Sequence, residues 1–281
     1  MERIVLCPNP HRDEGLAFTL QTKAALEKEG FEVLVSPVYG NAGRVVEETP
    51  LAKAVKGASL LVTLGGDGTI LRVAPAVMAE NVPILGVNLG HKGFLAEMER
   101  DDMDMLVAAV KGKREVIPRM MIDVCIYHGG RAVFADTALN DAVINGIVRS
   151  VHLTAFDGDK RIISFSGDGI ILCTPTGSTG YCMSAGGPLA EPGGESIILT
   201  PICAHDLAAR SFVLGSDKRV TVRPDTLEGR RCILSVDGRN PIDLCDGDEV
   251  IVTKSEYKTL LVHVGTKSFY DTAFEKLGER T

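Results

Sequence analysis

Apolar residues in the first hundred positions follow two spacings in turn, one typical of strands and one typical of helices. The predicted strands cover residues 3–7, 31–35, 59–64 and 83–87. The segment 13–29 carries Leu16 and Leu20 on one face, which predicts a helix that ends before Gly30, and 70–79 predicts another. Strands that alternate with helices favour an α/β domain with a parallel sheet.

After residue 100 the pattern changes to strand-length runs separated by turn residues. Gly129-Gly130 separates two such runs and Asp157-Gly158-Asp159 separates two more, which predicts two β-hairpins. The expected strands cover residues 114–127, 131–137, 142–144, 151–156, 160–165, 196–203, 220–223, 231–236, 249–253 and 259–264, and the expected helices 101–110 and 270–277. We therefore predict an α/β domain over residues 1–100 and a β-rich domain of two packed antiparallel sheets over 101–264.

Composition limits the classes of function. The chain has 281 residues, of which 45% are hydrophobic and 24% charged, as in an ordinary globular protein. Its net charge of −7 argues against a nucleic-acid-binding surface, and no apolar run approaches the roughly 20 residues that span a bilayer. The seven cysteines are scattered without a Cys-x-x-Cys pair, which favours reduced core thiols. We expect a cytoplasmic protein with neither nucleic acid nor membrane as a partner.

A glycine-rich loop, Gly65-Gly66-Asp67-Gly68-Thr69, joins a predicted strand to a predicted helix. Glycines let backbone N–H groups approach an anion, and the helix N-terminus adds partial positive charge. A carboxylate would repel phosphate, so Asp67 is useful only beside a divalent metal or where a sugar hydroxyl must lose a proton. The loop is neither a P-loop nor the dinucleotide fingerprint, because neither pattern is complete. It predicts phosphoryl transfer, with an ordinary turn as the alternative.

Two further stretches carry candidate chemistry. Residues 88–95 contain two glycines and Phe94, whose ring could lie against a base or ribose, although packing in the core is the alternative. Asn140-Asp141 precedes a predicted strand, where short polar side chains are unusual. A carboxamide can bind an adenine edge and a carboxylate can accept ribose hydroxyls, whereas the alternative is a plain turn.

The segment 167–181 is the richest in polar groups. An apolar strand ends there in hydroxyls, glycines and a proline, followed by Tyr181, which is typical of a small-molecule site. By contrast, Asp237-Gly238 is most simply a hairpin turn. The histidines show no metal-ligand spacing.

Taken together, these stretches resemble the NAD kinase family. The matching pieces, in the family's order, are residues 65–69, 88–95, 140–141, 167–181, 187–189 with Pro192, 200–205 and 235–239. Gly-Gly-Asp-Gly is shared with lipid kinases and phosphofructokinases, whereas Thr-Pro-Thr-Gly-Ser-Thr-x-Tyr is far more specific. The resemblance implies an α/β first domain, a β-rich second domain and a C-terminal segment, 265–281, that returns to the first. It also implies a homodimer or homotetramer that binds NAD between its domains.

The resemblance further implies Mg²⁺-dependent transfer of the γ-phosphoryl group of ATP to the adenosine-ribose 2′-hydroxyl of NAD. Asp67 would orient and deprotonate that hydroxyl. The phosphate path would be lined by Gly65, Gly66, Gly68 and Thr69. The residues expected around NAD are Phe94, Asn140, Thr176, Thr179 and Tyr181 at the adenine, Asp141 at a ribose, and Asp168, Gly180 and Ser184 at the other end. No side chain is assigned to the metal.

The sequence departs from the family pattern at Lys92, where leucine is frequent, and at Asp141, where glutamate is common. Two other functions remain as alternatives. A lipid kinase would share the glycine loop but has no use for the segment 167–181. A non-catalytic NAD(H) sensor would keep Asn140 and Tyr181 but would not need Asp67.

Overall fold

The computed structural model describes residues 1–38, 49–90, 93–206 and 208–278. The chain forms two compact units, Met1–Pro118 with Lys258–Thr281, and Arg119–Tyr257. It passes from one unit to the other within two long strands, β6 (Glu115–His128) and β17 (Asp248–His263).

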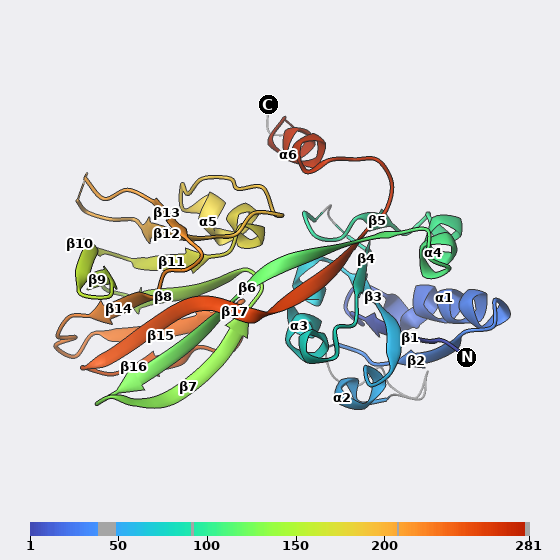
Figure 1. The fold of residues 1–281 in the computed structure, drawn as a ribbon, viewed down its shortest axis with the longest axis horizontal. Coiled ribbons are helices and arrows are strands. Elements are labelled where there is room, and N and C mark those ends of the chain that lie inside the picture. The colour runs from blue at the N-terminus through green and yellow to red at the C-terminus, as the bar shows by residue number, and fades with distance from the viewer. Residues whose placement is uncertain (39–48, 91–92, 207, 279–281) are drawn as a thin grey trace. The chain divides into compact units, whose positions relative to one another are not determined.

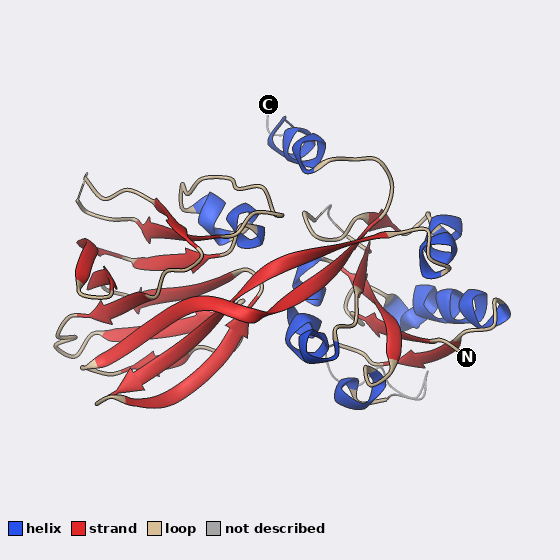
Figure 2. Ribbon diagram, in the orientation of Figure 1, coloured by secondary structure: helices blue, strands red, loops and turns tan. Residues whose placement is uncertain are grey.

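The first unit is built on a parallel sheet in the order β4–β3–β1–β2 (Figure 1). Its strands are β1 (Arg3–Pro8), β2 (Glu32–Val35), β3 (Ala58–Gly65), β4 (Ile84–Asn88) and β5 (Met98–Glu99). Its helices are α1 (Ala17–Lys28), α2 (Leu51–Ala54), α3 (Asp67–Val77), α4 (Met103–Val110) and α6 (Phe269–Gly278), with short 3-10 turns at Glu14–Leu16 and Met78–Glu80. Figure 2 shows helices on both sides of this sheet, as the alternating pattern predicted.

The sheet register brings the carboxyl ends of three strands to one edge. Pro8 at the end of β1 pairs with Leu64 of β3, and Gly65 pairs with Asn88 at the end of β4. Ligands of open parallel sheets bind beyond this edge. The glycine-rich loop follows β3 directly, so the fold places it where a ligand is expected.

The second unit consists of two antiparallel layers. One is a six-stranded sheet in the order β13–β12–β11–β8–β15–β16, and the other contains β10–β9–β14–β17 with β6 and β7. The remaining bounds are β7 (Arg131–Ala138), β8 (Asp141–Ile147), β9 (Val151–Asp157), β10 (Lys160–Gly167), β11 (Gly169–Cys173), β12 (Ser196–Ile202), β13 (Phe212–Gly215), β14 (Val220–Pro224), β15 (Arg231–Val236), β16 (Ile242–Leu244), the 3-10 turn η4 (Thr176–Thr179) and α5 (Tyr181–Ser184). One buried cluster draws Leu172 and Leu234 from the first layer and Leu153 and Val222 from the second. The predicted pair of packed sheets is confirmed.

Some details differ from the sequence pattern. The runs 249–253 and 259–264 form one strand, β17, because the polar stretch between them stays extended with Ser255 buried. The two compact units divide at Pro118 and Tyr257, whereas the domain bounds expected from the sequence are 100 and 264. The helix α4 packs its apolar face into the core of the first unit. It therefore belongs to that unit, although the strand-like sequence pattern begins soon after it. The strands β13 and β16 were not predicted, because runs of three or four residues carry little periodicity.

None of the described helices is long and apolar enough to cross a membrane. All seven cysteines are free. Four of them are buried, whereas Cys203 and Cys245 are exposed, so the expectation of core thiols holds for only part of the set.

Candidate active site

The glycine-rich loop forms the N-terminus of α3. Gly65 ends β3, Gly66 caps the helix, and Asp67 is its first residue, three positions before the predicted start. Thr69 is buried, and its Oγ1 accepts the Gly66 N–H at 3.3 Å while its own N–H donates to the Gly66 oxygen at 2.8 Å. A Cβ at Gly65 would lie 2.2 Å from Thr69 Oγ1, so a side chain there would displace the cap. The loop is therefore an ordered, capped helix N-terminus.

The Asp67 carboxylate is held by three backbone N–H groups of the segment after β4. Oδ2 accepts the N–H of Phe94 at 2.6 Å, and Oδ1 accepts those of Leu95 and Ala96 at 3.1 Å each. A Cβ at Gly93 would lie 1.8 Å from Oδ1, so only glycine fits there. A carboxylate oxygen accepts about two hydrogen bonds, so, counting the contacts of the described residues, Oδ1 is filled and Oδ2 retains one acceptor position. Oδ2 is the atom that can still bind a hydroxyl or a metal.

A cavity of about 370 Å³ surrounds this carboxylate. Its lining residues are Asn9, Arg12, Gly65, Gly66, Asp67, Gly68, Thr69, Asn88, Gly90 and Gly93. Arg12 is the one cation among these residues, and the absent side chain of Gly90 leaves room for it, because a Cβ there would lie 3.0 Å from Arg12 Nη1. Asn9 and Arg12 were not predicted. The only signal for them was a polar turn directly after the first strand.

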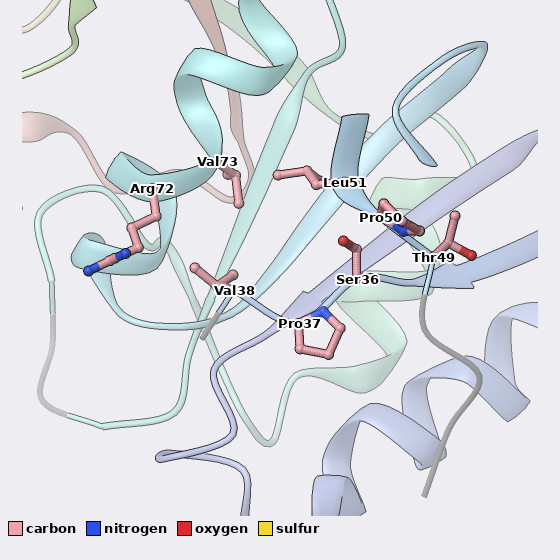
Figure 3. A pocket seen from close by; sticks show the side chains of 8 residues that line it. All are labelled: Ser36, Pro37, Val38, Thr49, Pro50, Leu51, Arg72 and Val73. Atoms are coloured by element: carbon pink, nitrogen blue, oxygen red, sulfur yellow. The ribbon is translucent and has the colours of Figure 1, made fainter. Parts of the chain in front are cut away.

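A second cavity of about 410 Å³ lies at the carboxyl end of β2 in the same unit (Figure 3). It is lined by Ser36, Pro37, Val38, Thr49, Pro50, Leu51, Arg72 and Val73. Figure 3 shows the Leu51 and Val73 side chains directed toward each other, whereas Arg72 extends away from them. The sequence predicted no function for these residues.

Phe94 is half-buried, and it is not part of the first unit's buried cluster. The ammonium group of Lys276, from α6, lies 4.0 Å from the centre of its ring. One face of the ring therefore already holds a cation. A base stacked on Phe94 must use the other face or displace Lys276. Lys92, whose role the sequence left open, falls outside the described residues.

In the second unit the structure brings Asn140 and the segment 174–181 together. A Cβ at Gly177 would lie 2.2 Å from the Asn140 carbonyl oxygen, and one at Gly180 would lie 3.5 Å from Asn140 Nδ2. Asn140 Oδ1 and Thr176 Oγ1 are both buried without a hydrogen-bond partner among the described residues. Buried polar groups are nearly always paired, so these two oxygens are candidate contacts for a ligand.

The other predicted NAD residues are only partly gathered there. Tyr181 follows this segment and is 44% exposed, Thr179 Oγ1 donates to the Thr176 oxygen at 3.2 Å, and Ser184 lies in α5. Asp168 is exposed, and it precedes β11, whereas the segment 174–181 follows that strand. Asp168 therefore lies the length of a strand away from Asn140, and one cluster does not contain them both.

Asp141 is buried next to a second carboxylate. Burial, and then the negative charge of Asp237, raise its pKa from 3.8 to about 7. Burial also raises the pKa of Asp237, but three backbone N–H groups and Arg239 oppose this effect. The proton of the pair therefore resides on Asp141.

Replacing Asp141 with Asn should stabilise the protein at pH 8 but not at pH 4. An acid whose pKa is raised by folding takes up a proton on folding, so stability falls as pH rises from 3.8 to about 7 and stays lower above it. Asparagine removes the ionised form, a gain on the order of a few kcal/mol at pH 8. Urea denaturation at both pH values measures it. Asp243→Asn is the control, because Arg231 lowers the pKa of that exposed carboxyl. An equal effect of Asp141→Asn at both pH values would contradict this assignment.

The described residues contain no group of three or more His, Cys, Asp or Glu side chains placed to hold a metal ion. Among the residues that line the cavity at α3, Asp67 is the one carboxylate. A divalent metal at this place would need most of its oxygen ligands from a bound substrate and water.

Comparisons with known proteins show the family of the chain. The model of the ATP-NAD kinase N-terminal domain matches residues 9–114, and that of the ATP-NAD kinase C-terminal domain matches residues 139–264. An NAD kinase of Acetivibrio thermocellus is 36% identical over 284 residues, which cover 100% of this chain and 98% of that protein. An NAD kinase of Symbiobacterium thermophilum is 39% identical over 256 residues, which cover 90% of each chain.

Two solved structures share the fold. Yeast NADH kinase complexed with NADH superimposes with a TM-score of 0.86 at 23% identity, over 99% of this chain and 88% of that chain. An NAD kinase from Archaeoglobus fulgidus in complex with ATP gives a TM-score of 0.76 at 24% identity, over 98% of each chain. With both family models and relatives above 30% identity over its full length, this chain belongs to the NAD kinase family.

Proposed function

We propose that the protein transfers the γ-phosphoryl group of ATP to the adenosine-ribose 2′-hydroxyl of NAD, and so makes NADP. The observation that carries the proposal is the Asp67 carboxylate, fixed by three N–H groups at a helix N-terminus with one acceptor position left on Oδ2. A fixed carboxylate in a glycine-lined cavity suits a base that must meet one hydroxyl beside an anionic donor.

The donor phosphates are assigned to the cavity at α3. Phosphoryl transfer depends on positioning and charge neutralisation more than on covalent chemistry. The helix N-terminus supplies backbone N–H groups, and Arg12 supplies a planar cation suited to phosphate oxygens. Mg²⁺ fits this cavity, because it keeps several waters and binds substrate phosphate oxygens. The donor phosphates and water would hold it, since the remaining position on Asp67 Oδ2 is assigned to the hydroxyl, and the ion would neutralise phosphate charge.

The adenosine half of NAD is assigned to Asn140, Thr176 and Tyr181. The unpaired Asn140 Oδ1 can accept a hydrogen bond from a nucleobase edge, the Thr176 hydroxyl can accept or donate one, and the exposed ring of Tyr181 offers an apolar surface. Asp141 is assigned to a ribose, and Asp168, the Gly180 backbone and Ser184 to the remaining half of the dinucleotide. We also propose, from the family resemblance, a cytoplasmic homodimer or homotetramer.

The experiment is incubation of the protein with ATP, Mg²⁺ and NAD, followed by an assay for NADP. A lipid kinase would phosphorylate diacylglycerol or sphingosine instead, and a sensor would bind NAD without turning it over. Formation of NADP that depends on both substrates supports the proposal, and its absence overturns it.

Replacing Arg12 with Gln should raise the KM for ATP about tenfold or more, because hydrogen bonds between a guanidinium and a phosphate are charge-assisted. The KM for NAD should change less than about twofold. Steady-state kinetics with each substrate varied in turn measure both values. Arg231→Gln is the matched control, since Arg231 forms an exposed pair with Asp243 in the second unit. An unchanged KM for ATP would remove Arg12 from the donor site.

A further inference from the structure

The hairpin turn after β15 carries a buried carboxylate. Asp237 and Gly238 both have left-handed backbones, with φ of 47° and 65°, and the Arg239 N–H donates to the Val236 oxygen at 2.9 Å. The predicted hairpin turn is therefore confirmed, since Asp and Gly suit these positions. Turn geometry does not explain why the Asp237 side chain is 9% exposed, because turn carboxylates usually face water.

The Asp237 carboxylate accepts three backbone N–H groups from a segment almost one hundred residues earlier. Oδ2 accepts that of Leu139 at 2.8 Å, and Oδ1 accepts those of Asn140 and Asp141 at 2.8 and 3.0 Å. The Asp237 N–H also donates to the Asp141 carbonyl oxygen at 2.9 Å. One residue thus binds four of the six backbone polar groups of residues 139–141.

Thr174 binds the other two. Its Oγ1 donates to the Leu139 oxygen at 2.6 Å and its N–H donates to the Asn140 oxygen at 2.9 Å. The backbone of residues 139–141 is therefore fully paired and fixed from two sides. The Asn140 side chain contrasts with this, because its Oδ1 is buried without a partner among the described residues.

Arg239 extends the contact from the same turn. Its Nη2 donates to the Thr137 oxygen at 2.7 Å and lies 2.8 Å from Asp136 Oδ2. The turn thus contacts Asp136 and Thr137 as well as residues 139–141. An ionised carboxylate accepts several N–H groups more strongly than a neutral side chain can.

We propose that Asp237 is a positioning residue for substrate recognition: by binding the N–H groups of residues 139–141, it fixes Asn140 so that its side chain meets the adenosine half of the dinucleotide. The inference rests on the proposed function and deepens it. Asp237 makes no direct contact with the substrate and acts through Asn140. A side chain that already has its binding orientation loses less conformational entropy on binding. The contacts of Asp237 with residues 139–141 therefore raise the affinity for NAD.

The test is a double-mutant cycle between Asp237→Asn and Asn140→Ala, with NAD affinity measured by calorimetry. Asparagine cannot accept the N–H groups on both of its side-chain atoms, so Asp237→Asn should weaken NAD binding about tenfold or more and leave the KM for ATP unchanged. Because Asp237 acts through Asn140, the double variant should bind NAD about as weakly as Asn140→Ala alone. Additive losses, or wild-type NAD affinity in Asp237→Asn, would overturn the proposal.

The matched control is Asp248→Asn. Asp248, the first residue of β17, is also a buried carboxylate of the second unit, and it accepts the Cys245 N–H at 2.7 Å and contacts His128. Asp248→Asn should lower stability without changing NAD affinity. If Asp237→Asn does not fold, Asp237→Glu takes its place in the cycle, since it keeps the charge but moves the carboxylate away from the N–H groups of residues 139–141. A wild-type protein that forms no NADP would overturn the proposed function, whereas wild-type turnover with an additive cycle overturns this inference alone.

Discussion

Replacing Asp67 with Asn should lower kcat at least a hundredfold and leave the affinity for NAD nearly unchanged. A positioned base contributes roughly 10²–10⁴ in rate, and asparagine cannot take a proton from a hydroxyl. The structure adds a second reason. The carboxylate also accepts the N–H groups of Phe94, Leu95 and Ala96, and an amide nitrogen would face one of them as a second donor.

Single-turnover kinetics with saturating ATP and NAD, together with calorimetry of NAD binding, measure this prediction. Asp102→Asn is the control, because Asp102 is a half-buried carboxylate of the same unit that accepts the Glu99 N–H at 3.3 Å. Gly93→Ala provides a second route to the same atom, since its Cβ would lie 1.8 Å from Asp67 Oδ1 and must displace it. An Asp67→Asn variant that retains more than about a tenth of wild-type kcat would remove Asp67 from the role of base.

The architecture could be predicted from the sequence because it depends on local periodicity. The alternating strands and helices before residue 100 and the hairpins after it have the spacing of their elements, and the structure places them accordingly. The strand β17 is an exception to this agreement. The polar middle of β17, around Ser255, resembles a turn in composition, but tertiary pairing keeps it extended and buries Ser255.

The site could be predicted only where one segment carries the chemistry by itself. The glycine-rich loop indicates Asp67 as a candidate. The three N–H groups that bind the Asp67 carboxylate lie 27 to 29 residues later, and no sequence spacing indicates them. Asp237 has the composition of a plain turn, and its partners at residues 139–141 lie 96 to 98 residues earlier. Arg12 follows the first strand without a motif, and only the shared sheet edge brings it to the cavity. Contacts between distant segments were therefore the part that sequence could not supply.

The analogue of NAD without the adenosine 2′-hydroxyl should bind and never be phosphorylated. Binding depends on groups assigned to the base and the ribose, whereas the reaction needs the single hydroxyl that meets Asp67 Oδ2. The analogue without the nicotinamide-ribose 2′-hydroxyl should still react, because that hydroxyl is not the acceptor. Calorimetry gives the affinities of both analogues, and release of ADP from ATP gives their turnover.

Phosphorus NMR of the product formed from NAD, ATP and Mg²⁺ tests the central claim most directly, because it shows which hydroxyl carries the new phosphate. Under the proposed function, one hydroxyl meets the fixed carboxylate of Asp67, so a single acceptor hydroxyl is expected. We predict one new phosphomonoester signal, assigned to the 2′ position of the adenosine ribose, and no such signal from the 2′-deoxyadenosine analogue. Phosphate on any other hydroxyl, or turnover of that analogue, would contradict the assignment of Asp67 as the base that selects the adenosine 2′-hydroxyl.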